Sequence, residues 1–206
     1  MEQWSNKYNT YKTKRTFLTS TGDTIQVGGS DKDTFGYMLD IEETSETLTN
    51  AGYGEVKDIK ASWQIKGKVR RKNSDIGNTY VEVSIPAQHL WYYKDGEVAL
   101  ETDVVTGGPA SGGTTTGVFM VLYKESPAVL KGDDYETHVQ YWMPVTYTGT
   151  GFHDASWRGS FGGNIYTYNG SHGCVNMPAN KAKELYDMIE TNTPAIIYEQ
   201  EGLSTN

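Results

Sequence analysis

Apolar residues occur only in short runs along this 206-residue chain, and glycine-rich or polar turns separate the runs. The longest unbroken run is Val118–Tyr123, far shorter than the ~20 residues that a membrane-spanning helix needs. Short runs rich in aromatic and β-branched residues, bounded by turn residues, are typical of strands. The sequence therefore predicts a mainly β protein whose aromatic residues, 12% of the chain, build its core.

The part of the chain after Asn78 is predicted to consist almost entirely of strands. They are expected at 80–85, 89–93, 97–105, 118–123, 137–148 and 194–198. One late helix is expected over Pro178–Glu190, with proline near its start and an apolar face formed by Ala182, Leu185 and Ile189. Many short strands with a single helix predict a β-sandwich-like domain.

The first 77 residues show a different pattern. Residues 12–28 predict a hairpin, and residues 40–51 predict a helix with Asp40 as its N-cap. A strand is expected within 56–68, and turn residues at 74–78 mark the predicted boundary. We predict a small α+β module at 1–77 and a second domain at 78–206. Because the module is short for a core of its own, we expect it to pack on that domain.

The charge balance limits the partners that this chain can have. Eighteen basic against 26 acidic residues give a net charge of −8, and the one basic run is Lys66–Lys72. This argues against nucleic acid or anionic lipid as a partner. The Gly107–Gly117 loop lacks the lysine and helix that follow in phosphate-binding loops, so we expect no nucleotide and no cofactor. The residues Met1–Trp4 show no secretory leader pattern.

Cys174 is the single cysteine, so the chain forms no internal disulfide. Its neighbours are Ser171, His172, Gly173 and Asn176, which is an unusual setting for a buried structural thiol. A reactive thiol needs a base and partial exposure, and a glycine before it lets the backbone approach a substrate carbonyl. The sequence therefore indicates a cysteine nucleophile, with the upstream His153 as a candidate base.

A metal site is the alternative interpretation of the same residues. His153, Asp154, His172 and Cys174 are all possible zinc ligands. No two of them have the spacing of four that places zinc ligands on one helix face, so we expect no metal.

From about Asn78 to Glu199 the chain resembles the L,D-transpeptidase (YkuD-like) catalytic domain family. The segments that carry the resemblance are Asp103–Gly107, Thr114–Phe119, Gly151–Asp154 and Ser171–Cys174. The His153–Arg158 and Phe161–Gly163 segments are similar to the Gram-positive branch, in which a peptidoglycan-binding-type domain precedes the catalytic one. The resemblance implies that residues 1–77 are the C-terminal part of such a module.

The resemblance implies a covalent mechanism on peptidoglycan stem peptides. Cys174 would attack the carbonyl before the terminal D-Ala of a donor tetrapeptide and form a thioester, with His153 as general base. Transfer to an acceptor stem amine would give a 3-3 type crosslink. The N–H groups of Gly173 and Cys174 would bind the oxyanion, with His172 on the same wall.

The resemblance leaves the partner of His153 open. Asp154 is a candidate, but adjacent residues on a regular strand face opposite sides, so a backbone carbonyl is the alternative. The expected substrate-binding residues are Ser171, Asn176, Tyr141, Trp142 and Trp157. Asn176 stands where many family members have arginine, and the three aromatic residues are either a substrate lid or core side chains.

Further expectations follow from the family alone. Carbapenem β-lactams should acylate Cys174, and the site of action should be the cell wall, outside the membrane. The chain would then be a soluble, monomeric piece of an exported, membrane-anchored parent. Two other functions use the same residues: an L,D-carboxypeptidase, in which water replaces the acceptor amine, and a cell-wall binding module without catalysis. The third residue of the stem stays open between L-Lys and diaminopimelate.

Overall fold

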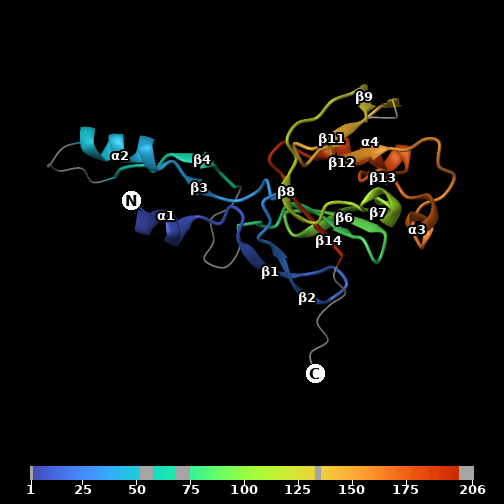
Figure 1. Ribbon diagram of the computed structural model, residues 1–206, viewed down its shortest axis with the longest axis horizontal. Coiled ribbons are helices and arrows are strands. Elements are labelled where there is room, and N and C mark those ends of the chain that lie inside the picture. The colour runs from blue at the N-terminus through green and yellow to red at the C-terminus, as the bar shows by residue number, and fades with distance from the viewer. Residues whose placement is uncertain (1, 52–57, 68–74, 133–135, 200–206) are drawn as a thin grey trace.

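Two packed β-sheets form the centre of the computed structural model, which describes residues 2–51, 58–67, 75–132 and 136–199 (Figure 1). Most of the predicted basic run Lys66–Lys72, and Ser74 at the predicted boundary, lie outside the described residues. Within the described part, no helix has both the length and the apolar character needed to cross a membrane.

The larger sheet has five strands in the order β7-β6-β5-β14-β8. These are β5 (Tyr80–Ser84), β6 (His89–Lys94), β7 (Glu97–Asp103), β8 (Gly117–Met120) and β14 (Pro194–Tyr198). Strands β5 and β14 run parallel, and the other neighbours are antiparallel. Strands β6 and β7 are joined by a tight turn, in which Asp95 and Gly96 both have positive φ, as the twist of a hairpin requires.

The smaller sheet has three strands in the order β11-β12-β13, and α4 lies beside it. Its elements are β11 (Trp142–Pro144), β12 (Gly151–Asp154), β13 (Val175–Met177) and α4 (Ala179–Met188). Phe152 and Val175 of this sheet share one buried core with Val83 and Ile197 of the larger sheet and with Leu185 of α4. The expected mainly β, sandwich-like fold is confirmed.

The hairpin of β1 (Lys14–Leu18) and β2 (Thr24–Gly28) packs on the larger sheet. Phe17, Ile25 and Val27 form a second core with Val118, Ile196 and Tyr198. Glu82, buried in that sheet, accepts hydrogen bonds from Ser20 N–H and from the Tyr198 hydroxyl, both at 2.8 Å. The expected contact of the N-terminal part with the larger domain is thus made by this hairpin.

A smaller lobe extends away from the sheets (Figure 1). It contains α1 (Glu2–Tyr8), β3 (Met38–Leu39), α2 (Ile41–Asn50) and β4 (Trp63–Ile65). Asp40 caps α2 as predicted, since its Oδ1 accepts from Glu43 N–H at 2.9 Å. The sequence did not predict α1, and β4 is shorter than the strand expected within 56–68.

Residues 33–35 connect this lobe to the edge of the larger sheet. The N–H groups of Thr34 and Phe35 both donate to Val118 O at 3.2 Å. Thr34 Oγ1 accepts from Met120 N–H at 3.0 Å and donates to Val145 O at 2.9 Å. One buried hydroxyl therefore joins strand β8 to the turn that precedes β12.

Three shorter pieces complete the fold around the site described below. The strands β9 (Ala128–Lys131) and β10 (Glu136–Val139) form a separate two-stranded sheet. A short 3-10 helix, η1 (Pro109–Ser111), lies within the predicted Gly107–Gly117 loop, and α3 (Ile165–Asn169) precedes the Ser171–Cys174 segment.

Candidate active site

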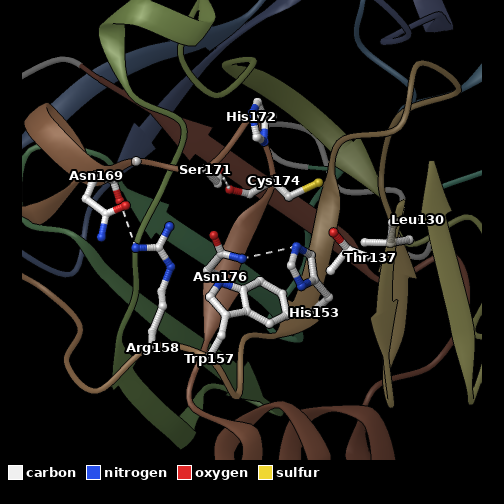
Figure 2. Close-up of a pocket in the computed structure, with 11 residues that line it drawn as sticks. Leu130, Thr137, His153, Trp157, Arg158, Asn169, Ser171, His172, Cys174 and Asn176 are labelled. Carbon is white, nitrogen blue, oxygen red and sulfur yellow. Dashed lines mark hydrogen bonds between the residues drawn. The ribbon is translucent and has the colours of Figure 1, made fainter. Parts of the chain in front are cut away.

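A cavity of about 250 Å³ opens where the β9–β10 sheet meets the ends of β12 and β13 (Figure 2). It brings together Cys174, His153, His172, Ser171, Asn176 and Trp157 from the sequence prediction. The sequence did not point to its other lining residues, which are Leu130, Thr137, Arg158, Asn169 and Gly170.

Residues Ser171–Cys174 form a tight turn, called the cysteine turn below, which two hydrogen bonds of the Ser171 hydroxyl close. Ser171 Oγ accepts from Gly173 N–H at 3.1 Å and donates to the carbonyl of Cys174. Gly173 has φ of +127°, a conformation that side-chain-bearing residues rarely adopt, so glycine is required there. The Ser171 hydroxyl thus shapes the turn, and the Gly173 N–H, expected to bind an oxyanion, is already used by Ser171.

The thiol of Cys174 is half-buried and protonated in this arrangement. Sγ donates to Gly149 O at 3.3 Å, in the turn that leads into β12. Burial raises the pKa of Cys174 to about 11, and a hydrogen bond from the Gly151 backbone acts weakly in the opposite direction. The partner of the thiol is therefore a backbone carbonyl rather than the imidazole of His153.

The Gly107–Gly117 loop holds the cysteine turn from the other side. Ser171 N–H donates to Thr106 O at 2.9 Å, and Thr114 Oγ1 donates to Gly173 O at 2.9 Å while accepting from Gly107 N–H. A Cβ on Gly107 would lie 2.6 Å from the backbone of Gly113, so the loop closes only with glycine there. The sequence did not predict this structural role.

His153 lies on β12 and is buried below the cysteine turn. Its Nδ1 donates to Asp154 O at 2.8 Å, and its Nε2 accepts from Asn176 Nδ2 at 3.2 Å. These bonds require the proton on Nδ1 and leave the lone pair on Nε2. Burial lowers the pKa of His153, and the charge of Arg158 lowers it further. The imidazole is thus a neutral base with its lone pair held by Asn176.

The Asp154 carboxylate faces away from His153. Its Oδ1 accepts from the N–H groups of Gln140 and Tyr141, at 2.8 and 2.7 Å. The backbone carbonyl of Asp154 is the group that holds His153, which resolves the two expected alternatives in favour of the carbonyl. Alternation along β12 is the physical reason, because adjacent side chains point to opposite faces.

The three aromatic candidates lie in different places. Trp142 is buried beside the site, with its ring centroid 5.9 Å from that of His153. Tyr141 packs against Tyr186 at 5.2 Å and does not line the cavity. Trp157 is 53% exposed and is the one of the three that lines the cavity.

Arg158 and Asn169 form the wall opposite the β9–β10 sheet (Figure 2). Arg158 Nη1 donates to Asn169 O at 2.7 Å, while its buried Nε has no partner. His172 is exposed at the rim of the cavity. Among the described residues, no group of three or more His, Cys, Asp or Glu side chains is arranged to hold a metal ion.

Comparison with known proteins gives one family. The model of the YkuD family, the L,D-transpeptidase catalytic domain, matches residues 78–197. No curated protein sequence matches the chain.

Solved structures of the same family are similar to this chain. The crystal structure of an Enterococcus faecium L,D-transpeptidase, a cysteine-to-serine variant, is 36% identical, with a TM-score of 0.82, over 96% of this chain and 79% of that one. The E. faecium catalytic domain acylated by ertapenem is 49% identical, with a TM-score of 0.54, over 59% and 98%. An L,D-transpeptidase from Mycobacterium smegmatis is 30% identical, with a TM-score of 0.53, over 59% and 58%.

Proposed function

This chain belongs to the L,D-transpeptidase (YkuD) family and is a peptidoglycan L,D-transpeptidase, and on that premise we propose that Cys174 is its nucleophile and His153 its general base. The observation that carries this proposal is the state of the imidazole. Its Nδ1 proton is held by Asp154 O, and its Nε2 lone pair faces the cavity that contains the only thiol of the chain.

In the proposed reaction the thiol first leaves Gly149 O and turns towards His153. As Sγ attacks the carbonyl before the terminal D-Ala of the donor stem, its proton passes to His153 Nε2, which Asn176 releases. The C–N bond to D-Ala then breaks, and the leaving amine takes that proton. An acceptor stem amine attacks the thioester that remains on Cys174 and loses its proton to His153. The C–S bond then breaks, and His153 returns that proton to the sulfur, which restores the thiol.

The negative charge of the tetrahedral intermediate needs a hydrogen-bond donor beside Cys174. We propose the N–H of Cys174 itself for this role, since the Gly173 N–H donates to Ser171 Oγ. Gly173 contributes instead by allowing the turn, because a Cβ would be strained at its φ. His172 and Trp157, at the rim and on the wall, are proposed to contact the stem peptide.

Carbapenems are proposed to acylate Cys174. The E. faecium catalytic domain that is 49% identical to this chain has been solved acylated by ertapenem. A strained β-lactam carbonyl would take the place of the stem carbonyl, and the ring nitrogen would be the leaving group. We also propose that residues 1–77 are the C-terminal part of a peptidoglycan-binding-type module, and that the protein acts at the cell wall as a monomer.

The first experiment is exchange with a D-amino acid. The protein is incubated with a tetrapeptide-stem muropeptide and excess D-Met, and the products are identified by mass spectrometry. We expect D-Met in place of the terminal D-Ala, and no product with Cys174→Ala. Exchange that persists in Cys174→Ala would refute the nucleophile, and loss of D-Ala without exchange would instead support the carboxypeptidase. A wild-type protein that binds the stem without reacting would support the binding module.

A further inference from the structure

Two buried side-chain atoms in the described part of the chain have no hydrogen-bond partner, and both belong to residues that line the active-site cavity. One is a donor, Arg158 Nε, and the other is an acceptor, Asn176 Oδ1. The orientation of the Asn176 amide follows from His153, because the Nε2 lone pair requires the NH₂ group to face it. Buried polar atoms nearly always have partners in native proteins, so such a pair indicates a place that a ligand fills.

The charge of the cavity wall that Arg158 and Asn169 form supports the same conclusion. Arg158 is the one residue with a permanent charge among the described residues that line the cavity, although the chain carries −8 overall. No carboxylate pairs with it within the described ranges, and its one hydrogen bond there is from Nη1 to Asn169 O. Figure 2 shows the guanidinium between Asn169 and Asn176. A partly desolvated guanidinium without a counterion favours a planar, bidentate anion, and a carboxylate has that shape.

We propose that Arg158 and Asn176 form a subsite for a carboxylate of the donor stem peptide. Arg158 would donate to the carboxylate, and Asn176 Oδ1 would accept from a neighbouring peptide N–H of the stem. This inference rests on the proposed function. The carboxylate has two possible sources, the terminal D-Ala and the side chain of a diaminopimelate third residue, and the experiment below separates them.

The subsite would make the enzyme select donors by charge. A stem in which the recognised carboxylate is an amide leaves the partly desolvated guanidinium without a counterion, which is costly. When the terminal carboxylate is the one recognised, a stem with one further residue is rejected for the same reason.

Binding at Arg158 would also act on the base. The positive charge of Arg158 lowers the pKa of His153. A bound carboxylate offsets that charge, so the imidazole becomes a stronger base when the correct donor is present. Arg158 would then couple binding of the donor carboxylate to the basicity of His153.

The test compares matched donors on the intact protein. The donors are an L-Lys tetrapeptide with a free D-Ala carboxylate, the same peptide with a D-Ala carboxamide, and diaminopimelate tetrapeptides with a free or amidated side-chain carboxylate. Wild type, Arg158→Gln, Arg158→Lys and the exposed-charge control Lys183→Gln are assayed for D-Met exchange, and KM and kcat are determined separately. Turnover of the first donor by wild type but not by Cys174→Ala tests the proposed function independently.

We expect wild type to prefer the free carboxylate by about 10- to 100-fold in kcat/KM, mainly through KM, as for other charge-assisted hydrogen bonds. Arg158→Gln should reduce the preference to less than about threefold, Arg158→Lys should keep part of it, and Lys183→Gln should keep all of it. A preference that follows either carboxylate and depends on Arg158 supports the subsite and identifies the source.

Equal rates on all donors with wild type would overturn the subsite, and this comparison needs no variant to fold. A preference that survives in Arg158→Gln would overturn it as well.

Discussion

The first 77 residues contain two regions that the sequence does not distinguish. The β1–β2 hairpin and residues 33–35 share a core with the larger sheet, and their hydrogen bonds reach the turn beside Cys174. The lobe of α1, α2, β3 and β4 extends away, and Trp4, Tyr8, Ile41 and Leu48 are exposed on it. The difference shows that a module boundary drawn from composition does not separate the residues that pack on the larger sheet from those that extend away from it.

The largest effect should come from the hairpin core. Ile25 is 1% exposed, so Ile25→Ala leaves a cavity against the larger sheet and should lower the free energy of unfolding by about 2–5 kcal/mol. Leu48→Ala in the lobe removes a side chain that is 37% exposed and should cost well under half as much. Denaturant unfolding measures both. Equal losses would contradict the proposed difference between the two regions.

Thr34→Val tests the connection between residues 33–35 and the site. The variant leaves Val145 O and Met120 N–H without their partner, at a cost of about 1–3 kcal/mol. The turn that carries Gly149 should loosen, and Cys174 should then react faster with iodoacetamide at neutral pH. Thr34→Ser keeps the hydroxyl and should restore the wild-type rate. An unchanged rate in Thr34→Val would show that the turn is held without Thr34.

Between pH 5 and 10 the pH dependence of stability should come from His153 and Cys174. The pKa of His153 lies below 6.5, so its stabilising contribution is present above pH 6.5 and is lost as the pH falls through the lowered value. The pKa of Cys174 is raised from 9.0 to about 11, so its contribution is present below pH 9 and is lost as the pH rises towards 11. Unfolding measured from pH 5 to 10 should show both limbs, because the raised pKa values of Tyr80, Tyr92 and Tyr198 reduce stability mainly above pH 10.

His153→Gln should flatten the acid limb, and Cys174→Ala should flatten the alkaline limb. The lobe variant Leu48→Ala should retain both limbs. If Leu48→Ala removed either limb, the assignment of these titrations to the site would be wrong.

The smallest effect on activity should come from the lobe. The rings of Trp63 and Tyr37 meet edge to face at 5.3 Å and hold β4 against β3. Trp63→Ala should speed hydrogen exchange in α2 and leave D-Met exchange at the wild-type rate. A fall in turnover of more than about twofold would place the lobe among the elements that support the site.

Local patterns predicted much of this molecule. The hairpin at 12–28, the Asp40 cap and strand 194–198 all lie where turn residues and alternation indicated them. The alternation of side chains along a strand also argued against the Asp154 carboxylate as the partner of His153. In the structure the Asp154 carboxylate does face away from His153. Each of these rests on residues close together in sequence.

Contacts between distant segments were not predictable in this way. Gly149 lies 25 residues before Cys174, and Thr114 lies 59 residues before Gly173, yet both hold the cysteine turn. Arg158 was part of a family-like segment, but its role depends on which cavity its guanidinium enters. No periodicity in one chain carries that information, because it depends on the packing of loops in three dimensions.

The parallel pairing of β12 with β13 places His153 directly opposite Asn176, two residues past the cysteine. A register between neighbouring strands therefore sets the position of the proposed base relative to the proposed nucleophile. Trp157, Arg158, Asn169 and His172 all lie on the crossover between these strands. We expect substitutions at these four positions to change which stem peptides bind without changing that register. The segment that would select the donor is thus separate from the strand register that places His153 opposite Asn176.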